Sequence, residues 1–535
     1  MLRVLEECDK VSADFSANPV HDLRVALRRC RSMADGLIAM DPDPEWKAMK
    51  KAGKQLFQRL GALRDVQIMM EWIEKLNLAA ISPSTPEDAT ASGGIAPVLE
   101  SSAQIPDVPQ HPAHALLKIL QAREAEQKRE ARAALEEFDR KQWRQWSRSL
   151  PQRAGRIRPG SAVFKHLALE RWTSARELHT VALRNRSQIA FHTLRIGIKR
   201  FRYIVENFLP AEHQAWAKDL KDMQDLLGDV HDLDVLWATA QSHHVLTDDA
   251  SRKAWHERIT QERTKRIDEY RHKTVAPDSL WNAWRAGLPH GKQIQEIATR
   301  RMKLWAKALD PDFAHSERVA RLSLQLYDGL NGASLLATGT ASTSRATGNG
   351  SEGDARASLY VAALLHDVGK ANGNKGHHKE SLELIKKHGT PLGWKEEDVH
   401  RAGLVARFHA GALPLRSHKA MRDLLPDEQR IVIRLAAILR LANALDSAHD
   451  GYIRNVQIEK APLSLNGKHH AIGFPRKAPA LGKNEALVIA AEGYVEGTPT
   501  AQAIAAERYL LETVLRRPVL VRAKKGMTAK REAFA

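Results

Sequence analysis

Four histidines and two aspartates in the C-terminal half of the chain are residues of the kind that bind divalent metals. They are His315, His366, Asp367, His378, His409 and Asp446. Each lies within, or at one end of, a segment whose apolar residues recur with helical periodicity, so helices could bring them together. Imidazole nitrogens and carboxylate oxygens without thiolates suit Mn, Fe, Co, Ni or Zn better than Ca. We therefore predict a metal site; the alternative is six unrelated residues in a chain with 24 histidines.

A second candidate site is the positively charged stretch FHTLRIGIKRFRY at 191–203. Its spacing of i, i+3, i+7 and i+10 places four side chains within about 80° of one another on a helix, over about 15 Å. These four are His192, Arg195, Lys199 and Arg202. No acidic residue occurs between Phe191 and Glu206, whereas a solvated helix face usually alternates acids and bases. The stretch predicts an amphipathic helix that faces an anion, with an ordinary solvated face as the alternative.

The same cationic pattern occurs earlier in the chain. HDLRVALRRCR at 21–31 repeats the spacing with His21, Arg24, Arg28 and Arg31. A second motif follows each copy, LGALRDVQIM from Leu60 and LGDVHDLDVL from Leu227, so this is an internal repeat with an offset of about 170 residues. Arginine forks and lysine ammonium groups both suit phosphate oxygens, and histidine could add pH sensitivity. The repeat therefore predicts one site for a shared polyanion.

These paired HxLRxxxRRxR-like motifs, each followed by an LGxxxD element, resemble the CHAD domain over about residues 1–280. The resemblance implies two pseudo-symmetric helical bundles that enclose a basic channel for inorganic polyphosphate, lined by the eight residues of the two stripes. One departure from the family pattern is the stretch 79–114, which has six prolines and no Lys or Arg. That composition predicts a disordered insertion.

The metal-ligand candidates resemble the pattern of HD-superfamily metal phosphohydrolases. More narrowly, LLHDVGKANGNKGHHKESLELI, VARFHAG and LAAILRLANALDSAH look like the C-terminal helical domain of the exopolyphosphatase/guanosine pentaphosphatase family, over about 290–460. The resemblance implies that His315, His366, Asp367 and Asp446 hold one metal. It further implies that Asp367 bridges to a second metal, which His378 and His409 complete. A low-complexity stretch at 332–358 is expected to be an inserted loop.

This second resemblance implies hydrolysis of a phosphoanhydride or phosphodiester bond by a metal-activated water, with two divalent ions for which Mg is also a candidate. Asp367 and Lys370 are the expected catalytic residues. Lys370, Lys375 and Arg407 are candidates to neutralise the phosphates of a small phosphorylated substrate, although for Lys375 and Arg407 an ordinary surface cation is the favoured alternative. The actin-like ATPase half of the exopolyphosphatases has no counterpart in the sequence, so their substrate cannot be transferred to this chain.

The chain as a whole is expected to be mainly α. Its 535 residues, 43% of them hydrophobic, predict several domains with cores of their own. We expect the two helical bundles at 1–280, an all-helical domain at 290–460 and a small α+β appendage at 461–535. In the tail, NVQIEK, EALVIAAEGY and RPVLVRA are typical of strands, a helix is expected at about 501–516, and 525–535 is expected to be flexible.

Charge and composition restrict the function further. A formal net charge of +18 indicates a polyanionic partner. Twelve tryptophans could stack on nucleic-acid bases, but no nucleic-acid-binding motif is present, so nucleic acid is not favoured. No run of 18 apolar residues and no secretory signal occur, and two cysteines are too few for a disulfide framework. We predict a cytoplasmic protein without a membrane span, with polyphosphate granules as a candidate location and the oligomeric state open.

Two functions remain open from the sequence. One is an enzyme in which the first half captures polyphosphate and the second hydrolyses polyphosphate or a nucleotide. The other is a binding protein that targets granules, in which the second half is a regulatory or structural module. Intact metal-ligand candidates favour the enzyme.

Overall fold

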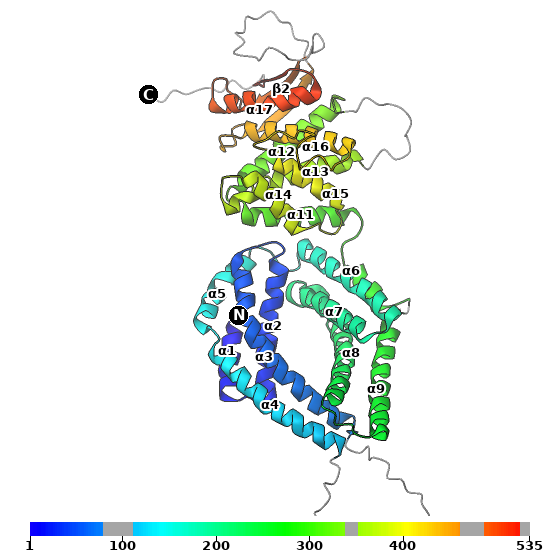
Figure 1. Cartoon of the computed structure of the whole chain (residues 1–535). Coiled ribbons are helices and arrows are strands. Elements are labelled where there is room, and N and C mark those ends of the chain that lie inside the picture. The colour runs from blue at the N-terminus through cyan, green and yellow to red at the C-terminus, as the bar shows by residue number, and fades with distance from the viewer. Residues whose placement is uncertain (79–110, 276, 337–350, 461–485, 525–535) are drawn as a thin grey trace, which may run out of the picture. The chain divides into compact units, whose positions relative to one another are not determined.

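A computed structural model describes residues 1–78, 111–275, 277–336, 351–460 and 486–524. The chain divides into two compact units, Met1–Gly291 and Lys292–Ala535. The described residues form seventeen α-helices and one three-stranded sheet near the C-terminus, which confirms the prediction of a mainly α protein with a small α+β appendage (Figure 1). None of the described helices is both long and apolar enough to cross a membrane.

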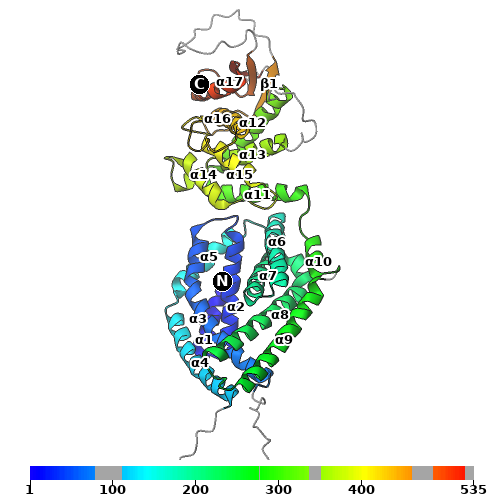
Figure 2. The same ribbon diagram turned by 45° about the vertical axis from the view of Figure 1, so that its right-hand side comes forward.

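The first unit contains ten helices within its described residues. The first five are α1 (Leu2–Ala13), α2 (Ala17–Leu37), α3 (Pro44–Lys75), α4 (Pro112–Glu136) and α5 (Arg140–Ala154). The second five are α6 (Ala162–Asn185), α7 (Gln188–Phe208), α8 (Pro210–Ser242), α9 (Asp249–Val275) and α10 (Leu280–Ala286). Figures 1 and 2 show α2–α5 gathered on one side of this unit and α6–α9 on the other.

The two cationic stretches form equivalent helices. Both α2 and α7 have 21 residues, and the helices that follow them, α3 and α8, have 32 and 33. Helix α2 packs against α7 and α3 packs against α8, so the two copies of the repeat meet in the middle of the unit. Local signals start these helices: the Asp43 carboxylate caps α3 and the Ser187 hydroxyl caps α7.

Unit 2 is built from a helical body and the sheet. Its helices are α11 (Lys292–Leu309), α12 (Phe313–Gly332), α13 (Ser351–Leu365), the 3₁₀ turn η2 (Val368–Asn372), α14 (His377–His388), α15 (Glu396–Arg407), α16 (Pro426–Leu445) and α17 (Pro499–Leu515). Its strands are β1 (Asn455–Lys460), β2 (Leu487–Glu492) and β3 (Val519–Ala523). Strand β2 lies in the centre, antiparallel to β1 and parallel to β3, with Ile489 opposite Ile458 and Val521.

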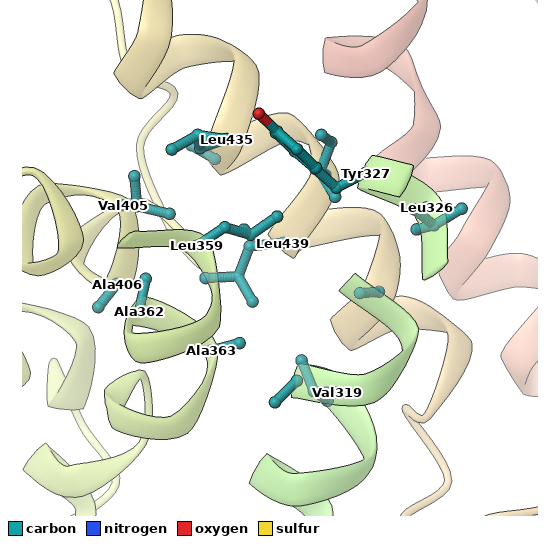
Figure 3. Close-up of a cluster of buried hydrophobic side chains, with 14 of the residues drawn as sticks. Val319, Leu326, Tyr327, Leu359, Ala362, Ala363, Val405, Ala406, Leu435 and Leu439 are labelled. Carbon is teal, nitrogen blue, oxygen red and sulfur yellow. The ribbon is translucent and has the colours of Figure 1, made fainter. Parts of the chain in front are cut away.

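A single apolar core fills unit 2. Figure 3 shows side chains of α12, α13, α15 and α16 meeting there, among them Val319, Leu359, Val405 and Leu439. The same core continues into Ile489, Leu511 and Val519 of the appendage, because α17 packs on α16 and β1 packs on α12. The predicted start of the appendage at 461 was therefore too late, since β1 already belongs to the sheet.

The ends of two predicted insertions also differ from the structure. Helix α4 begins at Pro112, a residue whose fixed φ suits the first helical position, so the insertion predicted for 79–114 extended too far. Helix α13 begins at Ser351, within the stretch 332–358 predicted as a loop. Residues 79–110 and 337–350 of these two stretches, and the predicted flexible end at 525–535, lie outside the described residues.

Close packing between α2 and α7 generates a testable prediction. A Cβ atom on Gly36 would lie 2.3 Å from Cε2 of Phe208, whose ring is buried and stacked on Phe164 with 4.2 Å between ring centroids. Gly36→Ala should therefore lower the free energy of unfolding by about 1–3 kcal/mol, despite the better helix propensity of alanine. Urea unfolding measures the change.

The matched control is Gly228→Ala in α8, where a Cβ atom meets nothing within 4 Å. There alanine should leave the stability unchanged or raise it by up to about 1 kcal/mol. Equal effects of the two substitutions would contradict the close α2–α7 contact.

Candidate metal centre and cationic cluster

The junction between α13 and α14 places two buried polar residues at the end of an apolar helix. Helix α13 ends at Leu365, and His366 and Asp367 follow it with 0% and 2% of their surface exposed. The Ser381 hydroxyl donates to the carbonyl oxygen of His366 (2.7 Å) and accepts from the Gly369 amide (2.9 Å). A Cβ atom on Gly369 would lie 2.1 Å from the carbonyl oxygen of His377, so this turn requires glycine.

Two buried histidines are oriented in the same way by the backbone. Nδ1 of His366 donates to the carbonyl oxygen of Ala363, and Nδ1 of His409 donates to that of Ala406, both at 2.7 Å. Because a carbonyl oxygen only accepts, the proton of each neutral ring lies on Nδ1. Metal-ligating histidines are commonly held by such a bond on the second ring nitrogen. The Nε2 lone pair of His366 has no hydrogen-bond partner among the described residues, whereas Nε2 of His409 lies 3.1 Å from Nε2 of His377.

Asp367 lies at the centre of a cluster of imidazole nitrogens. Its carboxylate oxygens are 3.4 Å from Nε2 of His366, 3.3 Å from Nε2 of His377 and 3.6 Å from Nε2 of His409. Two groups whose potential ligand atoms lie within 4.8 Å of one another share this aspartate; they are His315, His366 and Asp367, and Asp367, His377 and His409. Each group has a donor set that could hold a metal ion.

Two atoms of this cluster are buried without a hydrogen-bond partner among the described residues. They are Nε2 of His366 and Oδ1 of Asp367. Such atoms normally find a partner, because an unsatisfied buried polar group costs about 1–3 kcal/mol. A cation between them would satisfy both, so the residues present fit a divalent metal.

The charges in the cluster favour the protonation states that bind metals. Burial raises the pKa of Asp367, but His366, His409 and Lys370 outweigh it and hold that pKa well below its usual range. Burial lowers the pKa values of His366 and His409, so both rings are neutral at pH 7. Lys370 donates from Nζ to Oδ2 of Asp367 at 2.5 Å, so it lies beside this cluster, and its catalytic role stays a prediction.

His378 lies beside this cluster, whereas the neighbouring His377 lies in it. The ring centroid of His378 is 5.6 Å from that of His377 and 6.4 Å from that of His409. Its Nε2 faces Gly411, where a Cβ atom would lie 3.0 Å away. The sequence pair His377-His378 contained the right kind of ligand, but His378 does not belong to either group and His377 was missed.

Asp446 contacts a ligand candidate and is in neither group. Nδ1 of His315 bonds Oδ2 of Asp446 at 2.7 Å, and Arg318 Nε lies 3.0 and 2.9 Å from the two carboxylate oxygens. Burial raises the pKa of Asp446, but these two partners outweigh it and lower that pKa. Asp446 therefore orients His315, whose Nε2 lies 2.9 Å from Oδ1 of Asn443 and must exchange that contact to bind a metal.

His449 lies beside His315 and was not among the predicted site residues. Its ring stacks on that of His315 with 3.8 Å between centroids, and its Nδ1 bonds Oδ2 of Asp312 at 2.6 Å. Its signal was present in the quoted LDSAH motif, three residues beyond Asp446.

In the first unit the α2 stripe is fixed to the motif that follows it. Arg24 Nη1 donates to the carbonyl oxygens of Leu60 and Gly61, both at 3.1 Å. Arg31 Nη1 donates to the carbonyl oxygen of Lys50 at 3.3 Å. The guanidinium of Arg28 lies 5.4 Å from the centroid of the Tyr203 ring on α7, which links the two copies.

The two stripes converge on one cationic cluster, formed by Arg24, Arg28, Arg195 and Lys199. Burial lowers the pKa of Lys199 to about 7, assisted by the positive charges of Arg195, Arg28 and Arg24 and opposed by Asp232. The pKa of Arg24 is lowered by burial and by the charges of Arg28, Arg64 and Arg195, and Asp65 opposes this shift. Cations from both copies therefore act on one another, with Asp65 and Asp232 as nearby acids.

The ends of the stripes differ from the predicted pure cationic face. Arg202 lies 3.7 Å from a carboxylate oxygen of Glu206, which also bonds Arg29 at 3.3 Å. Much of the surface of His21 is exposed, but the part that is covered, followed by the charge of Arg64, lowers the pKa of this ring. Arg202 is thus partly neutralised and contributes less free charge than its spacing suggested.

Two residues of the repeat were missed as part of this site. Nδ1 of His192 lies 3.2 Å from Nδ1 of His231, and the residue equivalent to His231 in the first copy is Arg64, which lies near His21. Both precede the aspartate of the LGxxxD motif, so aligning the two copies could have identified them.

Comparison with known families agrees with this division into two units. The CHAD domain family matches residues 2–241, which contain both stripes. The family "Ppx/GppA phosphatase, domain III" matches residues 297–487, which contain every residue of the candidate metal centre. No curated protein matches the chain. The chain therefore contains a region that matches the CHAD domain, followed by a region that matches domain III of the Ppx/GppA phosphatases.

Proposed function

We propose that this protein binds inorganic polyphosphate through its CHAD domain and hydrolyses a phosphoanhydride or phosphodiester bond in its second unit, which is of the HD type. The observation that supports the enzymatic part is that two buried atoms, Nε2 of His366 and Oδ1 of Asp367, have no hydrogen-bond partner among the described residues. A fold that had no ligand for this place would avoid the cost of leaving both unsatisfied.

Two ions are proposed, held by the two groups that share Asp367. His315, His366 and Asp367 would hold the first, and Asp367, His377 and His409 the second. Bound divalent metals supply a water of lowered pKa and positive charge for phosphoryl oxygens. The ionised Asp367 keeps the negative charge that such ions need, and Lys370 adds a cation that can pair with substrate phosphate once a metal replaces it on Asp367.

Polyphosphate is the proposed ligand of the cationic cluster. Arg24, Arg28, Arg195 and Lys199 repel one another in the free protein, and a chain of phosphates relieves that repulsion along its length. Nucleotide phosphates have the same chemistry in a shorter form, so they are the competing ligand. A cytoplasmic location, and association with polyphosphate granules, stay predictions.

One observation favours a non-catalytic scaffold as the second candidate. Lys370 Nζ already lies 2.5 Å from Asp367 Oδ2, and this ion pair can neutralise the carboxylate without a metal. In that case unit 2 would be a regulatory or structural module.

Changing Asp367 tests the enzyme against the scaffold. Purified wild-type protein should contain a divalent metal by elemental analysis and release phosphate from polyphosphate or a nucleotide when Mn is added. Asp367→Ala should lower this rate by more than about 100-fold, the upper range for residues that only support a metal ligand. Binding of polyphosphate should stay unchanged, because the cationic cluster lies in the other unit. A wild-type protein that holds no metal and hydrolyses none of these substrates would establish the scaffold.

The positions of His377 and His378 give a second test. His377→Ala should weaken Mn binding by more than about 100-fold, because it removes a proposed ligand, whereas His378→Ala should weaken it by less than about tenfold. Titration of the metal-free protein, followed by electron paramagnetic resonance of free Mn, measures both. The opposite order would restore His378 as the ligand.

Polyphosphate binding should depend on pH through Lys199. Its pKa of about 7 means that the free protein loses this charge as the pH rises above 7, whereas bound phosphates favour the protonated form. Affinity should therefore fall between pH 7.5 and 9, by up to about tenfold per pH unit. In the free protein His21 and His192 are already largely neutral in this range, since their pKa values are lowered from 6.5.

Lys199→Arg is the control for this pH dependence, because arginine keeps its charge throughout the range. Its affinity for polyphosphate, measured by calorimetry at each pH, should stay nearly constant. If wild type and Lys199→Arg show the same slope, Lys199 is not the titrating group.

A further inference from the structure

Arg407 is a buried cation without a partner in the part of unit 2 that the structure describes. It is the last residue of α15 and only 7% of its surface is exposed. Its Nη1 is buried without a hydrogen-bond partner, and its guanidinium lies 5.4 Å from the ring centroid of Phe408. The ordinary surface cation that the sequence allowed is therefore not what the fold contains.

Other buried arginines of the same unit are paired. Arg401 donates to Asp398 at 2.7 Å and to Glu428 at 2.6 and 3.0 Å. Arg440 donates to Glu507 at 2.7 Å and to the carbonyl oxygen of Phe408 at 3.0 Å. A buried charge without a counter-ion lowers the free energy of unfolding. Because Arg401 and Arg440 have carboxylate partners among the described residues and Arg407 has none there, Arg407 reduces the stability of the ligand-free protein.

The surroundings of Arg407 are positive and adjoin the candidate metal centre. His409, a member of the second group, follows Arg407 by two residues, and the ring of His378 is 6.4 Å from that of His409. The charges that most lower the pKa of His378 after burial are those of Arg407, His377, Lys379 and Arg440, all of them positive. A ligand that enters beside His378 therefore meets cations on several sides, so an anion fits best.

We propose that Arg407 and His378 form an anion subsite, which binds the phosphate adjacent to the phosphate held at the metal centre. The planar fork of arginine suits two phosphate oxygens at once, and Nη1 of Arg407 has its donor capacity unused. This inference rests on the proposed function and narrows its substrate class. Unit 2 takes compounds with neighbouring phosphates, namely phosphoanhydrides, in preference to phosphomonoesters.

Methylenediphosphonate, whose P–C–P link cannot be hydrolysed, is the probe for this subsite. Calorimetry with the full-length Mn-loaded protein should show binding that Arg407→Met weakens by at least about 30-fold, the loss expected when a buried charged partner is removed. Lys379→Met removes the same charge from an exposed residue near the same histidine, and should stay within about threefold of wild type. All variants keep the CHAD domain intact, so differences among them report on unit 2.

Thermal unfolding of the ligand-free variants separates a binding role from a structural one. If Arg407 is held for a ligand, Arg407→Met should melt at a higher temperature than wild type, because an uncompensated buried charge is gone. A lower melting temperature, together with unchanged diphosphonate binding, would mean that Arg407 serves packing and would overturn the subsite.

Substrate comparison distinguishes failure of the subsite from failure of the proposed function. In Arg407→Met, kcat/KM for tripolyphosphate should fall while that for p-nitrophenyl phosphate is kept. If the wild type hydrolyses neither compound, and Arg407→Met binds diphosphonate more weakly than the wild type does, the hydrolase is refuted and the subsite is supported. If the wild type hydrolyses tripolyphosphate, but either binds no diphosphonate or binds it as tightly as Arg407→Met does, only the subsite is refuted.

Discussion

The constraint on which both units depend is the cost of holding polar and charged groups together without partners. In unit 2 this applies to Nε2 of His366, Oδ1 of Asp367 and Nη1 of Arg407, all buried without a hydrogen-bond partner among the described residues. In unit 1 it applies to cations of α2 and α7 that act on one another. Helix packing has to supply the stability that these groups remove, and it does so through extensive apolar cores.

Backbone contacts from distant elements fix the geometry of the metal centre. Arg440 of α16 donates to the carbonyl oxygens of Phe408 and Gly411, on either side of His409, and is held in place by Glu507 of α17. The turn that carries a candidate ligand is thereby fixed to the C-terminal helix. This explains physically why the α+β segment shares one core with the helical body: without α17, Arg440 would lose its carboxylate partner.

Periodicity predicted the helices, because it depends only on spacing along one helix, and the repeat predicted one site built from two equivalent helices. Rotation at a helix start is harder to predict. Helix α14 begins at His377 after Gly376 in a left-handed conformation, and this start decides which of two adjacent histidines, about 100° apart, faces Asp367. Asp446 was predicted as a ligand because its type is right, but its partners Arg318 and His315 lie more than 120 residues away in sequence. Such contacts are fixed only by tertiary packing.

The repeat in unit 1 is symmetric in position but not in chemistry. Arg24 in the first copy already donates to two carbonyl oxygens, whereas Nε of the equivalent Arg195 is buried without a partner among the described residues. The first copy has Arg64 where the second has His231, so a permanently charged side chain in one copy corresponds to a titratable ring in the other. Because donors that are already bonded contribute less to a new ligand, the second copy keeps more of the unsatisfied capacity that a phosphate chain requires. The two stripes therefore differ in their capacity to bind an anion, although both helices have the same sequence pattern.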